Sequence, residues 1–202
     1  MIKFEKNISQ LLPYNRTNYI AYFNDEDDTF DRNVIWYGVS LQQADIKDQK
    51  LYQVSEQIVV NSVNRLENAF KEIVSEFDQG LPWVINHDDK DLPWFNTENK
   101  RMPQLQNLFK QNDIPISFIG CLVFNKEDVV NFARELITYP YDLLSKISYK
   151  TLDISHTKLP LILKLTGHLT LDIVSTDKAL LTKISHLDKL DSFLKIPYRS
   201  RE

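Results

Sequence analysis

The sequence has few of the residues that build the commonest catalytic and nucleotide-binding motifs. Only four glycines occur among its 202 residues, and they are isolated from one another, so neither a GxGxxG fingerprint nor a GxxxxGK[ST] phosphate loop can be written. GxSxG, HExxH and CxxC motifs are also absent. Nucleotide-binding folds of the usual kind, hydrolases with a nucleophile elbow, zinc proteases and zinc ribbons therefore lack their signature residues.

Cysteine and long apolar runs are equally scarce. The single cysteine, Cys121, lies in the apolar run FIGCLVF and has no partner for an internal disulfide, so we predict a buried structural thiol rather than a nucleophile. No stretch reaches the roughly 18 apolar residues that a membrane span needs. The N-terminus has no apolar core followed by a small-residue cleavage site, which argues against a signal peptide. We therefore expect a cytoplasmic protein without a membrane span.

The charge of the chain is concentrated in one short segment. The net charge is −4, and the segment NDEDDTFDRN (24–33) alone has five acids against one base, so the remainder of the chain is close to neutral. The five acids of this first acidic segment are Asp25, Glu26, Asp27, Asp28 and Asp31. Such a cluster repels itself unless solvent, a cation or a basic partner takes up its charge. The acidic balance argues against a nucleic-acid partner and favours a basic protein.

A second acidic segment (88–91) contains Asp88, Asp89 and Asp91 and lies in the proline- and tryptophan-bearing stretch 81–102. Trp94 follows it closely. An aromatic anchor ringed by polar groups is favoured at protein interfaces, so one interpretation places Trp94 with these acids on a contact surface. The other interpretation is that the indole of Trp94 caps the core from a loop.

Two metal-binding interpretations compete with partner binding. Counted from Asp25 as a calcium loop, position 6 is Phe30 instead of glycine and position 12 is Trp36 instead of glutamate, so the loop does not fit. A metal-dependent hydrolase or nuclease that uses Asp88, Asp89 and Glu98 is the alternative function, because Asp88-Asp89-Lys90 and Glu98-Asn99-Lys100 have the acid-x-lysine spacing that such sites use. Those sites need a strand, whereas this stretch is broken by prolines. We therefore predict no catalytic residue, no metal and no cofactor.

Hydrophobic periodicity predicts an α+β fold, with a mixed or antiparallel sheet covered by helices. The clearest helix spans 55–77, with an apolar stripe at spacings of three and four: Val59, Val63, Leu66, Phe70, Ile73 and Phe77. Its seven-residue repeat indicates a core face; the alternative is a seam between two chains of a structural homodimer. Further helices are predicted at 103–112 and from Asn125 to Pro140.

The strands are predicted from β-branched and aromatic runs. Residues 18–23 and 34–41 are expected to form an antiparallel pair around the first acidic segment. A C-terminal β-hairpin, 159–165 with 169–175, is expected to have a three-residue loop and to be followed by a helix capped by Ser175 or Thr176 and by a frayed tail. We expect a single domain, 1–202; a division into 1–80 and 103–202 joined by 81–102 is the alternative.

The acidic segments and the C-terminal half together give the chain a family resemblance. An acidic, single-cysteine α+β chain with NDEDDTFD, HDDKDLPWF and LTLDIVSTDKALLTKI resembles the immunity proteins that bacteria make to neutralise contact-dependent or secreted toxins. The resemblance implies a stoichiometric, non-catalytic inhibitor that covers the active site of one basic, nuclease-like toxin. Acidic clusters speed the encounter with a basic surface, and an aromatic anchor slows dissociation.

Overall fold

The computed structural model describes residues 2–24, 29–31, 35–47, 54–87, 92–95, 102–143 and 151–201, with the backbone alone at 21–24, 29–31, 142–143 and 200–201. Helices in these residues are α1 (Arg16–Tyr22), α2 (Glu56–Glu76), α3 (Pro103–Gln111), α4 (Lys126–Leu143) and α5 (Lys178–Ser185). Short 3₁₀ turns lie at Ile8–Gln10 and Asp188–Leu190. The strands are β1 (Lys3–Glu5), β2 (Phe23–Asn24), β3 (Thr29–Asp31), β4 (Tyr37–Gln42), β5 (Trp83–His87), β6 (Cys121–Phe124), β7 (Leu152–His156), β8 (Leu161–Leu165), β9 (Leu171–Ser175), β10 (Leu194–Pro197) and β11 (Arg199–Arg201).

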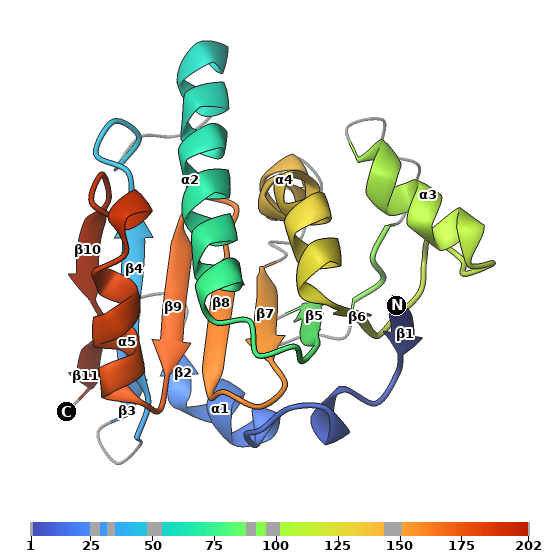
Figure 1. Cartoon of the computed structure of the whole chain (residues 1–202), viewed down its shortest axis with the longest axis horizontal. Coiled ribbons are helices and arrows are strands. Elements are labelled where there is room, and N and C mark those ends of the chain that lie inside the picture. The colour runs from blue at the N-terminus through green and yellow to red at the C-terminus, as the bar shows by residue number, and fades with distance from the viewer. Residues whose placement is uncertain are drawn as a thin grey trace.

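Eight of the described strands form one antiparallel sheet in the order β1-β6-β5-β7-β8-β9-β4-β10 (Figure 1). The termini lie at its opposite ends. Strands from before and after the segment 81–102 alternate in this sheet, since β4 is inserted between β9 and β10. A second, three-stranded sheet has the order β11-β3-β2. The predicted α+β class, with an antiparallel sheet covered by helices, is confirmed.

The predicted C-terminal hairpin is present, and α5 follows it, but its register differs by two residues from the prediction. Leu163 pairs with Ile173 and Leu165 with Leu171, so the loop has five residues, 166–170. The loop is closed by Thr166 and Thr170, whose backbone N···O distance is 3.3 Å and whose hydroxyl oxygens lie 2.7 Å apart. A two-residue shift preserves the period of a strand, so every side chain still lies on the predicted face.

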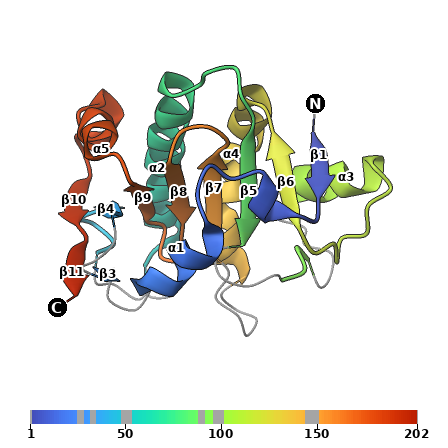
Figure 2. The same cartoon turned by 90° about the horizontal axis from the view of Figure 1, so that it is seen from below.

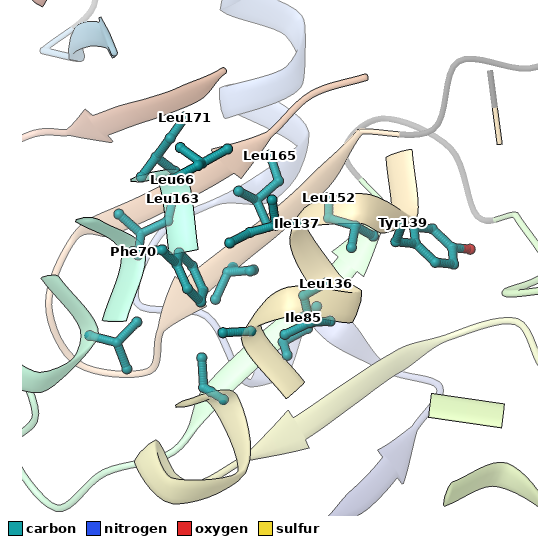
Figure 3. Close-up of a cluster of buried hydrophobic side chains, with 14 of the residues drawn as sticks. Leu66, Phe70, Ile85, Leu136, Ile137, Tyr139, Leu152, Leu163, Leu165 and Leu171 are labelled. Atoms are coloured by element: carbon teal, nitrogen blue, oxygen red, sulfur yellow. The ribbon is translucent and has the colours of Figure 1, made fainter. Parts of the chain in front are cut away.

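The main core lies between the sheet and the layer formed by α2, α4 and α5, with α3 at the end of the sheet near β1 (Figure 1). The side chains that meet at its centre come from two helices and the middle strands (Figure 3): Leu66 and Phe70 of α2, Leu136 and Ile137 of α4, and Leu152, Leu163, Leu165 and Leu171 of the sheet. Each is at most 1% exposed. This apolar layer carries most of the hydrophobic stabilisation of the fold.

Helix α2 is the element that the sequence predicted most closely. The hydroxyl oxygen of Ser55 accepts a hydrogen bond from the backbone N–H of Ile58 at 3.4 Å, which caps the helix as expected. At the other end, Gly80 adopts φ +68°, a conformation that favours glycine. The apolar stripe of α2 is in the core of the same chain. The alternative in which that stripe forms a seam between two chains is therefore wrong.

Several predicted elements differ from the structure. Residues 18–23 were expected to be a strand, but α1 covers most of them, because Oδ1 of Asn15 accepts from the N–H of Asn18 at 3.0 Å and starts a helix. Pro140 does not end α4, which continues to Leu143. Asp177, not Ser175 or Thr176, caps α5, since its carboxylate accepts from two backbone N–H groups. The tail, expected to be frayed, forms β10 and β11.

The second face of the sheet is covered by the N-terminal segment that contains α1, on the side away from α2 and α4 (Figure 2). Aromatic side chains make up much of this cover: the rings of Tyr14, Tyr19 and Trp36 lie with their centroids 5.1–5.8 Å apart. Tyr19 packs against Ile162 of β8 and Val174 of β9. The two faces of the sheet are therefore covered by different kinds of layer.

Candidate functional site

Most residues of the proposed contact surface lie outside the residues that the structure describes. This applies to Asp25, Glu26, Asp27 and Asp28 of the first acidic segment, to Asp88, Asp89 and Asp91 of the second, and to Glu98 of the alternative metal site. Asp31 is described by its backbone, as the last residue of β3. The structure does show where the two acidic segments are attached to the fold.

The attachment points of the two acidic segments are linked through one short helix. The second segment follows His87, the last residue of β5, and Nη2 of Arg16 donates a hydrogen bond to the backbone oxygen of His87 at 3.0 Å. Arg16 starts α1, whose seven residues correspond to about 10 Å of helix. Helix α1 leads directly into β2, which ends at Asn24, where the first segment begins. One short helix therefore connects the places where both segments leave the fold.

A basic strand runs beside the first acidic segment. Strand β11 pairs in parallel with β3, in a register that sets Arg199 opposite Thr29 and Arg201 opposite Asp31. The register therefore places two arginines of the C-terminal segment on the strand next to β3, which belongs to the first acidic segment.

Trp94 is not part of an exposed surface. Its side chain is 0% exposed, and its indole Nε1 donates to the backbone oxygen of Gly120 at 3.0 Å. Its backbone N–H donates to the oxygen of Phe118 at 3.0 Å, beside an isolated antiparallel bridge between Pro93 and Ile119. The interpretation of Trp94 as a contact anchor is wrong; the alternative, a tryptophan that caps the core from a loop, is correct. Phe95, its neighbour, is also buried.

A buried histidine precedes the second acidic segment. His87 is 3% exposed, and its Nε2 lies 2.9 Å from the hydroxyl oxygen of Tyr139 on α4. That hydroxyl donates in turn to the backbone oxygen of Trp94. Burial raises the pKa of Tyr139, so its hydroxyl is protonated at neutral pH and donates to Trp94. The hydroxyl oxygen then accepts a hydrogen bond from His87, whose Nε2 therefore carries the ring proton. This chain of contacts fixes the end of β5.

On the second face, polar side chains line up across five neighbouring strands. We call Asn86, Asp153, Lys164, Asp172 and Ser40 the polar row, because their register pairs them strand by strand in that order. Each is at most 3% exposed. Nζ of Lys164 lies 3.9 Å from Oδ1 of Asp153. Removing one member of a buried charged set costs several kcal/mol, because its partners stay buried without compensation.

The cover of the polar row is itself tied down by polar contacts. The hydroxyl of Tyr14 lies 2.8 Å from Oγ of Ser155, which sits on β7 two residues beyond Asp153. Burial raises the pKa of Tyr14, with a smaller contribution from the negative charge of Asp153. The N-terminal segment is therefore locked onto the second face by aromatic packing, this hydrogen bond and the Arg16 contact.

The polar row was missed by reasoning from the sequence. Asp153, Lys164 and Asp172 each stand at an alternate position of an otherwise apolar strand, in LDISH, LILKL and LDIVS. That pattern is also typical of a strand with one face in solvent, so it did not indicate burial. The signal that could have found the row is that charges of opposite sign occur at matching positions of three consecutive strands.

Two further observations concern metals and membranes. Among the residues that the structure describes, no group of three or more His, Cys, Asp or Glu side chains is placed to hold a metal ion. No helix in this part of the chain is long and apolar enough to cross a membrane. Cys121 is a free, buried thiol, as predicted, and burial raises its pKa to about 12.

Comparison with known proteins adds no relative to these observations. No protein-family model, no curated protein and no solved structure matches the chain.

Proposed function

We propose that the protein is a non-catalytic immunity protein that acts in the cytoplasm, where it binds and neutralises a basic, nuclease-like toxin through its two acidic segments. The observation that carries this proposal is that α1 links the attachment points of the two segments. Arg16, at the start of α1, contacts His87, which precedes the second acidic segment, and α1 leads to the first. Carboxylates grouped on one part of a surface produce a stronger local field than scattered ones, and the link through α1 supports such a grouping.

The distribution of the other acids supports the same surface. Several acids on the helix side of the fold are paired with bases of the same chain, as in Asp45 with Arg65, Glu67 with Arg134 and Asp78 with Lys126. Such pairs are neutral to an approaching partner. The first acidic segment alone carries a charge equal to the net charge of the chain, so the acidic segments would steer a cationic partner toward the ends of α1 and β5.

The toxin is expected to be encoded by the gene next to the one for this chain. Expression of the neighbouring gene product alone should stop bacterial growth, and co-expression of this chain should restore it. The variant Asp25→Lys, Asp27→Lys, Asp28→Lys should restore growth poorly, because it reverses the charge of the surface. A neighbouring product that is not toxic, or a toxicity that this chain leaves unchanged, would contradict the proposal.

A matched variant separates loss of binding from loss of folding. Asp188 and Asp191 are exposed acids in and beside the 3₁₀ turn at Asp188–Leu190, away from the first acidic segment. Changing both to lysine raises the net charge by 4, against 6 for the triple variant, and should leave the rescue of growth intact. Calorimetric titration with magnesium, manganese and calcium tests the alternative hydrolase, for which micromolar binding at Asp88, Asp89 and Glu98 would be expected.

A further inference from the structure

A turn next to the sheet is held by a histidine ring nitrogen, which can accept hydrogen bonds only while it is unprotonated. His156 is the last residue of β7, and its side chain is 0% exposed. Its Nδ1 accepts two hydrogen bonds, from the backbone N–H of Lys158 at 3.1 Å and from that of Leu159 at 2.9 Å. Because backbone amides only donate, Nδ1 must be unprotonated and the ring proton must lie on Nε2.

Both hydrogen bonds belong to the connection between β7 and β8. The other contacts of this turn come from Thr157, whose N–H and hydroxyl lie 3.3 Å and 2.9 Å from the backbone oxygen of Pro82, and from Leu161, whose N–H donates to the oxygen of Leu159. Leu159 also packs against the main core. His156 is thus what holds the middle of the turn, while Thr157 holds its beginning.

We propose that His156 is a pH-sensitive latch: a proton that binds Nδ1 removes both acceptor contacts and releases the turn between β7 and β8. The only basic atom of the neutral ring is the one that holds the turn, so the protonated ring and the closed turn exclude each other. The opening is local, because β7 and β8 remain paired with their neighbours through their own ladders.

The groups around His156 set the pH at which this happens. Trp83 of β5 stands directly opposite, with ring centroids 5.0 Å apart and the rings at 90°. Burial lowers the pKa of His156 and the charge of Lys158 lowers it further, while the carboxylate of Asp78 acts in the opposite direction. Asp78 is itself paired with Lys126 of α4, at 3.0 Å.

The sign of the effect follows from that lowered pKa. The neutral ring stabilises the folded state fully above the ordinary histidine pKa of about 6.5. As the pH falls below this value, the unfolded chain takes up the proton first, and the stabilising contribution is lost as the pH passes through the lower pKa of the folded state. The turn is therefore closed at neutral pH and opens on acidification.

Amide hydrogen exchange measured by NMR on the full chain tests the latch. As the pH falls from about 7 to below the pKa of the His156 ring, which titration of its ring nitrogens locates, the protection factors of Lys158 and Leu159 should fall at least about tenfold, since two hydrogen bonds are lost together. The protection factors of Ile162 and Leu163 in β8 should stay constant. In His156→Asn, whose side-chain oxygen accepts from the same amides and does not titrate, the protection should be independent of pH.

The control and the direct readout keep the test decisive. His168→Asn changes an exposed histidine of the next turn and should leave the pH dependence as in the wild type. If His156→Asn does not fold, the ring nitrogens of wild-type His156 are titrated by two-bond ¹H–¹⁵N correlation. An unprotonated Nδ1 at neutral pH whose titration coincides with the loss of protection supports the latch. A protonated Nδ1 at neutral pH, or a titration that leaves Lys158 and Leu159 protected, overturns it.

Discussion

The two faces of the main sheet are built on different principles. The face under α2 and α4 is filled by leucine, isoleucine and phenylalanine, and the described helices meet it with apolar side chains. The face under α1 contains the polar row and is covered by a segment that is held by tyrosine and arginine contacts. The comparison indicates that the first face supplies stability. The second face, at a cost in burial of charge, positions the segments that we propose to be functional.

The largest effect is expected on the apolar face. Phe70→Ala removes a fully buried ring from the centre of α2 and should lower the free energy of unfolding by about 3–5 kcal/mol. Urea unfolding followed by circular dichroism measures this change. Val60→Ala lies on the same helix at 38% exposure and should change the stability by no more than about 0.5 kcal/mol. Equal effects of the two variants would mean that α2 does not pack as described.

A smaller loss of stability is expected from substitutions in the polar row. Comparing two variants shows whether the loss comes from uncompensated charge or from packing. Lys164→Met should lower the free energy of unfolding by about 3 kcal/mol, because Asp153 and Asp172 stay buried without the ammonium group between them. The triple variant Asp153→Asn, Lys164→Met, Asp172→Asn should be closer to the wild type, since no uncompensated charge remains. If urea unfolding shows the triple variant to be the less stable of the two, the charges are not coupled.

Tyr14 tests how firmly the cover is held on the second face. Tyr14→Phe removes the hydrogen bond to Ser155 and should cost about 1 kcal/mol at neutral pH. The raised pKa of Tyr14 gives the folded state a contribution that is present below about pH 10 and is lost as the pH rises toward the folded value.

Alkaline unfolding shows whether that contribution belongs to Tyr14. Wild-type stability should decline above about pH 10, and Tyr14→Phe should decline less steeply. Tyr37, which is 43% exposed, provides the matched control, because Tyr37→Phe should keep the alkaline decline of the wild type. Parallel curves for wild type and Tyr14→Phe would show that the hydroxyl of Tyr14 is not buried.

The smallest effect is expected from the basic strand beside the first acidic segment. Arg199→Gln with Arg201→Gln removes two positive charges next to β3 and should speed association with a basic toxin by a few-fold, since less of the acidic field is compensated. Stopped-flow fluorescence measures the rate. Lys47→Gln with Lys110→Gln makes the same charge change elsewhere and should have the weaker effect. An equal effect would mean that net charge matters and position does not.

Elements with a strong period could be predicted from the sequence, and those fixed by contacts far along the chain could not. The stripe of α2 predicted that helix within a residue at either end. The hairpin faces were correct although the register was not, because loop length depends on local turn geometry and facing depends only on alternation. In contrast, the prolines of 81–102 indicated a long loop or a pair of short edge segments, whereas Trp83 to His87 form a strand in the interior of the sheet.

The candidate site was predicted only in part, for a related reason. Acidic composition identified the two charged segments, but the link between their attachment points depends on the contact between Arg16 and His87, which are 71 residues apart. A tryptophan beside acidic residues is equally compatible with a contact surface and with the core, and only the burial of Trp94 in the structure distinguishes the two. Predicting the polar row requires knowing which strands are neighbours. The alternation of polar and apolar residues within one strand does not give that information.

The central claim, that the acidic segments capture a basic toxin by charge, is tested most directly by the salt dependence of association. For the wild type, the association rate constant should fall at least about tenfold between low and high salt, as for electrostatically steered complexes. For Asp25→Lys, Asp27→Lys, Asp28→Lys the rate should be low throughout and nearly independent of salt. Identical rates and identical salt dependence for the two proteins would contradict the account.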